Sequence, residues 1–348
     1  MTRRRPSRPV VLVPRDPLLA ACLDPAAERL QARGLAVVRP ASAAPADWAA
    51  DLAGADTVVL TPRQRFGPAE LAAATRLAGI VFPTIGVEAL DLDAASALGI
   101  AVGFGATPEL IAGMAEANVL MIAAMLLDLP AKQQALRERG WRDGTVRARL
   151  VQGKTIGFVG FGRIARATLR RLQGWEVRAL YHDPHIDAAA GDDATRAPDL
   201  ATLLRASDVV AVMVDQRPET VGMLGAAELA MMKPDACLVN AARGAVVDEA
   251  ALAHALSAGA IAGAALDAFA AEPLSADSPL RRLDNVLLTP HNLGHTREQQ
   301  ASFVRALVDN VAAIAAGEPP PYFKNPQVLA AWRARLERLA TQSGASAS

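Results

Sequence analysis

Short apolar runs alternate with helical patterns along almost the whole chain. Most runs have the length of a strand and are followed by a loop or by an Ala-rich stretch. They form a first series at 10–13, 36–38, 57–60, 80–82 and 100–102, and a second series at 155–159, 177–181, 209–212, 237–240, 264–267 and 286–289. Continuous apolar strands separated by helices are typical of parallel sheets that are covered on both faces. The pattern therefore predicts an α/β protein with two doubly wound parallel-sheet domains.

Two long segments have the pattern of helices. The most apolar one, 110–129, ends before Pro130, and its uncharged middle is too short to span a bilayer, so we expect a long buried helix. A second helix is expected over 296–316. The polar, Gly-containing segment 137–152 is interpreted as the joint between the domains.

Composition limits the class of protein. The 348 residues suggest two domains, and 36 basic against 36 acidic residues leave no net field for nucleic acid or an anionic membrane. The basic N-terminus lacks the apolar stretch of a signal peptide. Cys22 and Cys237 lie in no metal-like or redox-like spacing, so we expect reduced cysteines and a cytoplasmic protein.

A glycine-rich stretch follows the predicted strand 155–159 and precedes a predicted helix, which is the context of a dinucleotide-binding motif. Gly160 would allow the tight turn and Gly162 the close approach of backbone to pyrophosphate, while Ala165 replaces the third glycine where helix and strand pack closely. The amides at the helix start, at Arg163 and Ile164, would face the phosphates.

The end of the next predicted strand favours NAD as the cofactor. Asp183 lies 23 positions after Gly160, close to the roughly 20 expected for an acid that binds the ribose hydroxyls. A carboxylate there repels a 2′-phosphate, and Pro184 follows it in place of an Arg that would attract one. The alternative interpretation is that Asp183 and Pro184 simply form a turn.

Arg243, Glu272 and His291 each lie in a loop that follows a strand of the second series. The strand ends of an open parallel sheet meet at one crevice, so these three side chains are expected to converge. A 2-oxo acid offers a carboxylate and a ketone. The forked guanidinium of Arg243 can hold both, His291 can exchange a proton with the ketone oxygen, and Glu272 can orient the imidazole. Taken singly, the three residues could be a turn, a loop and a buried histidine.

Four stretches together resemble the D-isomer-specific 2-hydroxyacid dehydrogenase family: GFVGFGRIA, MMKPDACLVNAARGAVVDEAAL, GAALDAFAAEPL and NVLLTPHNLGHT. The resemblance implies that Arg243, Glu272 and His291 are the catalytic triad. It also implies that Asp267 holds the nicotinamide carboxamide, and we assign Ala241 to the cofactor site with it.

The resemblance further implies an inserted domain and a homodimer. A flavodoxin-like substrate domain would comprise 9–109 with 297–325, and a Rossmann-type NAD domain would comprise 110–296. The tails at 1–8 and 341–348 are expected to be disordered.

The chain departs from the family pattern at two places. Thr84 stands where members usually have the first glycine of a substrate loop, so Ile85 and Gly86 are the remaining candidates there for binding the substrate carboxylate. Met213 and Asp215 replace a His and Pro of many members. Both changes affect the expected substrate and leave the triad intact.

Two alternatives share this architecture: a formate- or phosphite-type dehydrogenase, and an NAD(H)-sensing scaffold like the family's corepressors. The pair of Glu272 with His291 argues against a formate-type site, where an amide typically replaces that acid. A metal site is not expected, because His291 and His295 have no third ligand.

Overall fold

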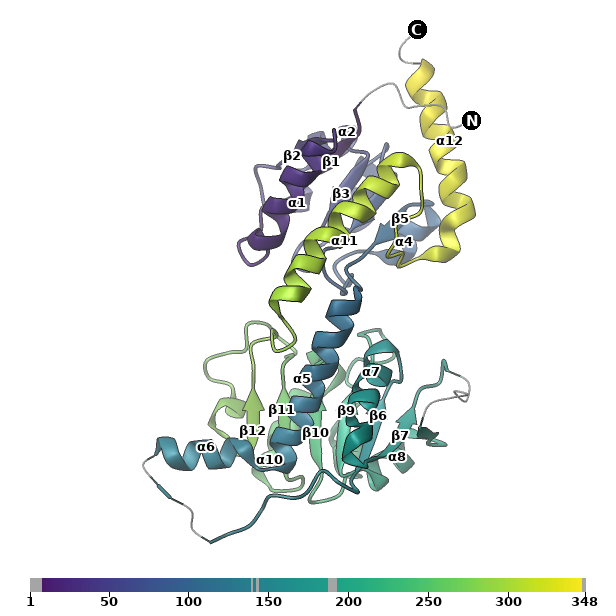
Figure 1. The fold of residues 1–348 in the computed structure, drawn as a ribbon. Coiled ribbons are helices and arrows are strands. Elements are labelled where there is room, and N and C mark those ends of the chain that lie inside the picture. Colours follow the sequence, from purple (N-terminus) through teal and green to yellow (C-terminus); the bar gives the residue numbers. More distant parts are fainter. Residues whose placement is uncertain (1–7, 139, 142–143, 187–192, 346–348) are drawn as a thin grey trace. The chain divides into compact units, whose positions relative to one another are not determined.

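The computed structural model describes residues 8–138, 140–141, 144–186 and 193–345, and it confirms the α/β fold with two parallel sheets (Figure 1). The chain divides into two compact units: Met1–Leu110 with Thr296–Ser348, and Ile111–His295. The segment 137–152 lies inside the second unit, so its interpretation as the joint is wrong. The chain passes between the units after Leu110 and after His295 instead.

The first unit contains a five-stranded sheet in the order β2-β1-β3-β4-β5. This is the order of flavodoxin-like sheets, in which ligands bind where the strand order reverses, beside β1 and β3. The strands are β1 (Val10–Leu12), β2 (Ala36–Val38), β3 (Thr57–Val59), β4 (Gly79–Val81) and β5 (Ala101–Gly103). The helices are α1 (Ala20–Ala32), α2 (Ala49–Gly54), α3 (Pro68–Ala73), α4 (Leu92–Ala97), α11 (Arg297–Ala316) and α12 (Leu329–Ala345).

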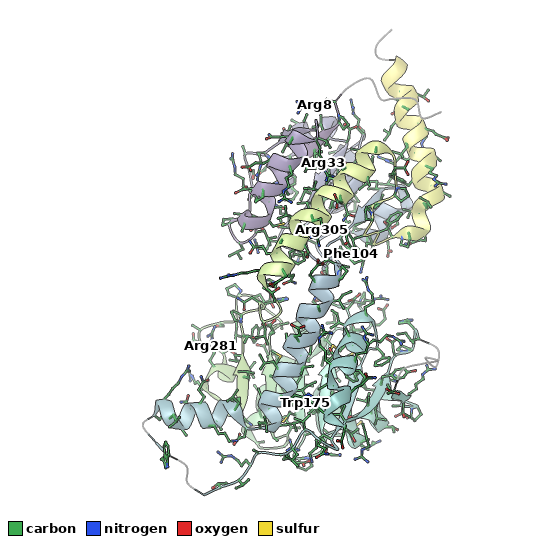
Figure 2. The ribbon with its side chains drawn as sticks, viewed as in Figure 1. Arg8, Arg33, Phe104, Trp175, Arg281 and Arg305 are labelled. Carbon is green, nitrogen blue, oxygen red and sulfur yellow. The ribbon has the colours of Figure 1, made fainter. Side chains whose placement is uncertain are left out.

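Helix α11 joins the N-terminal and C-terminal parts of the first unit. It packs along α1, and Arg33 at the end of α1 lies 3.1 Å from Asp309 of α11 (Figures 1 and 2). Its other face approaches β4 so closely that a Cβ on Gly79 would lie 2.6 Å from Ile314 Cδ1. The predicted helix over 296–316 is therefore present, and Thr296 caps it by accepting the Gln299 N–H.

The chain after α11 covers the exposed edge of the first sheet. Phe323 pairs antiparallel with Gly103, and the Lys324 N–H donates to the Val102 carbonyl at 2.8 Å. Asn325 is fully buried; it accepts the Val102 N–H at 2.8 Å and donates to the Ile100 carbonyl at 3.0 Å. An edge strand left open would pair with other chains, so this segment completes the sheet.

The first unit extends beyond the predicted limit of 325. In α12, the buried Trp332 donates its indole N–H to the Ala78 carbonyl, and Arg335 donates to the Leu77 carbonyl. Residues 341–345 are helical, so the prediction of a disordered tail from 341 onward is wrong for them. The tail residues 1–7 and 346–348 lie outside the described residues.

The second unit contains a seven-stranded sheet in the order β12-β11-β10-β9-β6-β7-β8. The strands are β6 (Thr155–Val159), β7 (Arg178–His182), β8 (Ala194–Arg196), β9 (Val209–Val212), β10 (Cys237–Asn240), β11 (Gly263–Leu266) and β12 (Val286–Leu288). The helices are α5 (Pro108–Leu126), which begins in the first unit, α6 (Leu129–Arg137), α7 (Arg163–Leu172), α8 (Leu200–Ala206), α9 (Ala226–Leu229) and α10 (Glu249–Ser257). Strand β8 was not predicted, because it is short and its Thr195 and Arg196 are polar and exposed.

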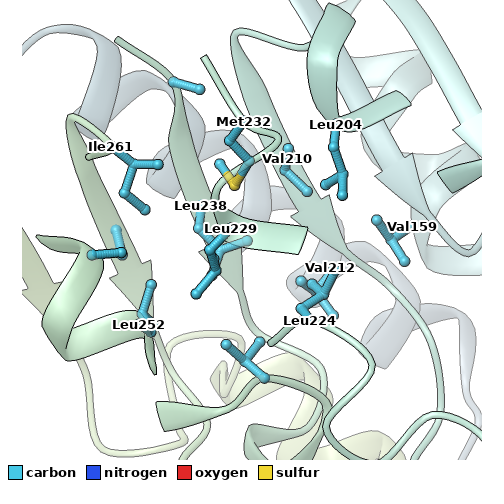
Figure 3. Close-up of a cluster of buried hydrophobic side chains, with 14 of the residues drawn as sticks. Val159, Leu204, Val210, Val212, Leu224, Leu229, Met232, Leu238, Leu252 and Ile261 are labelled. Carbon is cyan, nitrogen blue, oxygen red and sulfur yellow. The ribbon is translucent and has the colours of Figure 1, made fainter. Parts of the chain in front are cut away.

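Apolar side chains cover both faces of this sheet. Along β9, Val210 and Val212 point into one cluster, shown in Figure 3, while Val209 and Ala211 point into another. Alternate residues of one strand thus enter two cores, which is why the strand has a continuous apolar run. The second cluster includes Met121, Ile122, Met125 and Leu126 of α5.

Helix α5 confirms the predicted buried helix but has different ends. Among the described residues it is the one helix long and apolar enough to cross a membrane. Of its most apolar 18-residue stretch, 56% is buried in the fold, as in a core helix. It ends at Leu126, and Asp128 adopts a left-handed conformation with φ 56°. Pro130 lies in the first turn of α6, where a missing N–H costs nothing, and so begins a helix rather than ending one.

Replacing Asn325 by Ala should destabilise the first unit by about 2–4 kcal/mol, because the buried Val102 N–H and Ile100 carbonyl lose their partner. Urea unfolding followed by tryptophan fluorescence can report on this unit. Trp48 and Trp332 are buried in it, whereas Trp141 and Trp175 of the second unit are 75% and 40% exposed.

The matched control is Gln327→Ala, an exposed amide two positions away in the same turn. It should unfold at the same urea concentration as the unaltered protein. Equal midpoints for the Asn325 and Gln327 variants would show that Asn325 does not secure the sheet edge.

Candidate functional site

The glycine loop between β6 and α7 has the open surface that a phosphate needs. Gly160 has φ +88°, and a Cβ there would lie 2.7 Å from Val214 Cγ1, so only glycine fits. A Cβ on Gly162 would meet no atom within 4 Å. Gly162 is the N-cap of the ten-residue α7 and provides no side-chain cap, and the N-terminus of a helix is a place where phosphate groups bind. The loop therefore fits the pyrophosphate of a dinucleotide.

The residues at the start of α7 lie where the sequence places them. Arg163 and Ile164 form the first helical positions, and Arg163 is exposed. Ala165 is 1% exposed and packs in the core cluster that also contains Phe158 of β6. A small side chain here lets the helix lie close to the strand.

Asp183 lies at the mouth of this loop, immediately after β7. Its Oδ2 accepts the Phe161 N–H and its Oδ1 accepts the His185 N–H, both at 2.9 Å. A carboxylate oxygen has a second lone pair, so both oxygens can still accept a hydroxyl proton. Asp183 is thus a fixed negative charge beside the glycine loop, as a ribose-binding acid requires.

The sequence interpretation gave no role to the aromatic residue between the two glycines. Phe161 is fully buried and stacks on Tyr181 of β7, with ring centroids 4.4 Å apart and planes at 16°. Arg166 of α7 covers the ring, with its guanidinium carbon 4.8 Å from the centroid. These contacts stabilise the glycine loop. An aromatic residue inside a glycine loop is the only sequence signal for them.

Glu272 and His291 meet, as predicted, from the loops after β11 and β12. His291 Nδ1 lies 2.8 Å from both carboxylate oxygens of Glu272, and one of these oxygens also accepts the Phe269 N–H at 3.0 Å. The two side chains are 42% and 39% exposed, so the pair is accessible to a small molecule. With Nδ1 bound to Glu272, Nε2 is the ring nitrogen left for other partners.

The pair shifts the proton affinity of both groups. The hydrogen bond that His291 donates to Glu272 raises the pKa of His291 above its ordinary value, against the opposing effect of burial. Burial alone would raise the pKa of Glu272, but the hydrogen bonds from His291 and the Phe269 N–H lower it overall. The arrangement therefore favours a charged imidazolium beside a carboxylate.

Arg243 follows β10 and lies close enough for its charge to act on both members of the pair, where it lowers the pKa of each. The adjacent Gly244 explains how its loop reaches them. A Cβ on Gly244 would lie 1.9 Å from the Phe269 carbonyl carbon, so the Arg243 loop can touch the Glu272 loop only with glycine there. Ala241, also assigned to the cofactor site, is 7% exposed at the end of β10.

Asp267 follows β11 and contacts the chain around His291. It is 1% exposed, and it accepts the Thr289 hydroxyl and the N–H groups of Asn292 and Leu293. The sequence interpretation did not include Thr289. Thr289 and Asp267 follow different strands, so no local sequence pattern indicates that they form a hydrogen bond.

The remaining candidates from the sequence are the substrate-loop residues and His295. Ile85 and Gly86 belong to the first unit, in the turn after β4. Burial and the charge of His291 lower the pKa of His295. Within the described part of the chain, no group of three or more His, Cys, Asp or Glu side chains is placed to hold a metal ion.

Known proteins share this sequence and fold. The family model "D-isomer specific 2-hydroxyacid dehydrogenase, NAD binding domain" matches residues 119–292. A D-3-phosphoglycerate dehydrogenase of Archaeoglobus fulgidus is 34% identical over 76% of this chain and 50% of its own length, so the chain spans about half of that relative. A glyoxylate reductase of Thermofilum pendens is 36% identical over 74% of this chain and 77% of its own length.

A solved structure extends the similarity beyond the matched domain. The NADPH-dependent glyoxylate/hydroxypyruvate reductase of Sinorhizobium meliloti is 29% identical and superimposes with a TM-score of 0.77, covering 91% of this chain and 97% of that one. The family match covers half of the chain, and the 36% identity to the reductase extends over most of both proteins. The chain therefore belongs to the D-isomer specific 2-hydroxyacid dehydrogenase family.

Proposed function

We propose that the protein transfers a hydride between NAD(H) and the α carbon of a small 2-oxo or D-2-hydroxy acid. The observation that carries this proposal is the 2.8 Å bond between His291 and Glu272, beside the loop of Arg243. Family membership supports the same reaction class. Bound nicotinamide would supply or accept the hydride.

Each of the three side chains has a distinct task in this proposal. Arg243 binds the substrate carboxylate with its fork and polarises the ketone oxygen. His291, bound to Glu272 through Nδ1, uses Nε2 to protonate that oxygen during reduction and to remove the proton during oxidation. Glu272 keeps the ring in this orientation and stabilises its charged form.

For the cofactor, the proposed binding residues are Gly160, Gly162, Arg163, Ile164, Ala165, Asp183, Ala241 and Asp267. The fixed carboxylate of Asp183 favours NAD(H), because it repels a 2′-phosphate. The Sinorhizobium relative is NADPH-dependent, so the family includes both preferences and the choice rests on this residue.

For the substrate, we propose a small 2-oxo acid of the glyoxylate or hydroxypyruvate type, because relatives that carry those names match most of their length. Ile85 and Gly86 would contribute backbone amides to its carboxylate. We place the activity in the cytoplasm, which the unpaired, buried cysteines fit and which cell fractionation would test.

We also propose a homodimer, because one segment of the second unit exposes many apolar side chains. We define the apolar arm as Leu129, Leu136, Trp141, Val146 and Leu150, which are 49%, 60%, 75%, 86% and 70% exposed. Exposed apolar groups gathered on one segment mark an interaction surface. A second copy is the simplest partner that could cover them.

The first prediction of this proposal concerns turnover. The purified protein should oxidise NADH with glyoxylate or hydroxypyruvate, and kcat/KM should be at least about tenfold lower with NADPH, corresponding to about 1.4 kcal/mol of repulsion. The measurement is loss of absorbance at the nicotinamide band across a panel of 2-oxo acids. His291→Gln is the inactive control. Tight NADH binding without turnover on the whole panel would favour a sensor, and faster turnover with NADPH would refute the role of Asp183.

The second prediction concerns pH. Reduction requires protonated His291, so its rate falls as the pH rises through the His291 pKa, which Glu272 raises. In Glu272→Gln this alkaline limb should move to lower pH. Oxidation requires neutral His291, so its activity should extend to lower pH in the same variant.

The measurement is kcat/KM against pH in both directions. Glu249→Gln is the matched control, because Glu249 accepts the Ala270 N–H of the same loop and does not contact His291. Its profile should match that of the unaltered protein. Superimposed profiles for Glu272→Gln would mean that Glu272 does not act on His291.

The third prediction concerns the apolar arm. Sedimentation at micromolar concentration should give twice the chain mass of 36.3 kDa. The double variant Leu136→Glu with Trp141→Glu should sediment as a monomer, because it places two charges in the interface. Trp175→Glu, an exposed tryptophan outside the arm, should remain dimeric. A stable 36.3 kDa species for the unaltered chain would remove the claim.

A further inference from the structure

The carboxylate of Asp267 receives its hydrogen bonds from the segment that carries His291. Its Oδ1 accepts the Thr289 hydroxyl at 2.6 Å, the Asn292 N–H at 3.0 Å and the Leu293 N–H at 3.3 Å. Its Oδ2 accepts the Leu293 N–H at 3.2 Å, the one hydrogen bond to this oxygen among the residues that the structure describes. Because Asp267 is 1% exposed, these donors replace water around a buried carboxylate.

His291 has a backbone conformation that needs such support. Its φ of +52° lies in the left-handed region, which is uncommon for a residue with a side chain. Such conformations persist where the surroundings hold them. Thr289 holds this one from two sides, because its carbonyl accepts the His291 N–H at 3.0 Å and its hydroxyl binds Asp267.

The direction of the His291 ring depends on this turn. Nδ1 can face Glu272 only while the backbone at 291 turns the side chain toward the loop after β11. We infer that Thr289 is a positioning residue: through Asp267, its hydroxyl fixes the turn that aims His291 at Glu272. The inference rests on the proposed function of His291.

This role is separate from the binding of the nicotinamide carboxamide that the family resemblance assigns to Asp267. Three donors occupy Oδ1, whereas Oδ2 has one longer contact and retains acceptor capacity. Removing the Thr289 hydroxyl therefore loosens the turn at His291. It leaves Oδ2 of Asp267 available to the cofactor.

The charged groups that face the His291 ring define the expected pH effect. Glu272 and Asp267 raise its pKa, and Arg243 lowers it. His295 is a further titratable group, on which His291 itself acts. Loosening the turn weakens the largest of these influences, the bond to Glu272, so the pKa of His291 should fall.

The test compares Thr289→Val, which keeps the shape and loses the hydroxyl, with Thr289→Ser, which restores it. Thr289→Val should lower kcat for reduction by roughly 10- to 100-fold, the scale of a misplaced catalytic group, and move the alkaline limb to lower pH. The Kd for NADH, measured by fluorescence, should stay unchanged. Thr289→Ser should restore both kcat and the limb. Thr289→Cys, whose thiol is a weaker donor than a hydroxyl, should fall between them and serves if the valine variant does not fold.

Titration of the His291 ring by NMR gives a readout that needs no turnover. The chain has five histidines, so the His291 signal can be assigned by its loss in His291→Gln. Its pKa should be lower in Thr289→Val than in the unaltered protein. An inactive wild type would refute the proposed function, while the titration would still decide this inference.

Two results would overturn the inference. One is an unchanged His291 pKa and unchanged pH limb in Thr289→Val. The other is weaker NADH binding with the limb in place, which would show that Thr289 acts through the cofactor alone.

Discussion

The site depends on one hydrogen bond, which the imidazole of His291 donates through Nδ1 to the carboxylate of Glu272. This bond selects the ring nitrogen that stays available, favours the charged ring, and requires two loops to lie within 2.8 Å. Two backbone features near the pair support this arrangement. His291 adopts a left-handed conformation, and Gly244 lets the Arg243 loop touch the loop of Glu272.

The parallel sheet of the second unit explains how the glycine loop and the Glu272–His291 pair could serve the proposed reaction together. In such a sheet every strand ends at the same edge, so the loops after β6, β7, β10, β11 and β12 all open there. The loop after β6 supplies the glycines and the start of α7, and the loop after β7 supplies Asp183. The loops after β10, β11 and β12 supply Arg243, Glu272 and His291. The proposed hydride transfer needs both sets at one end of the sheet, and the parallel direction of the strands places them there.

The sequence predicts a structural feature well when the residues that determine it lie in one short segment of the chain. The sequence predicts the strands at 155–159 and 237–240 to the residue, because each is a mostly apolar run that is buried on both faces. The polar segment 137–152 was misread as a joint, because polarity reports exposure and an exposed segment can lie inside a domain. The residues of the pair follow from motifs, but the bond from Thr289 to Asp267 joins positions 22 apart, and no local pattern encodes it.

A crystal structure of the protein with NADH and an unreactive 2-oxo acid analogue such as oxamate tests the central claim most directly. The account predicts that His291 Nδ1 stays on Glu272, that Nε2 lies about 2.6–3.2 Å from the oxygen that mimics the ketone, and that Arg243 binds the analogue carboxylate. A His291 ring turned away from Glu272, or an analogue carboxylate bound without Arg243, would contradict it.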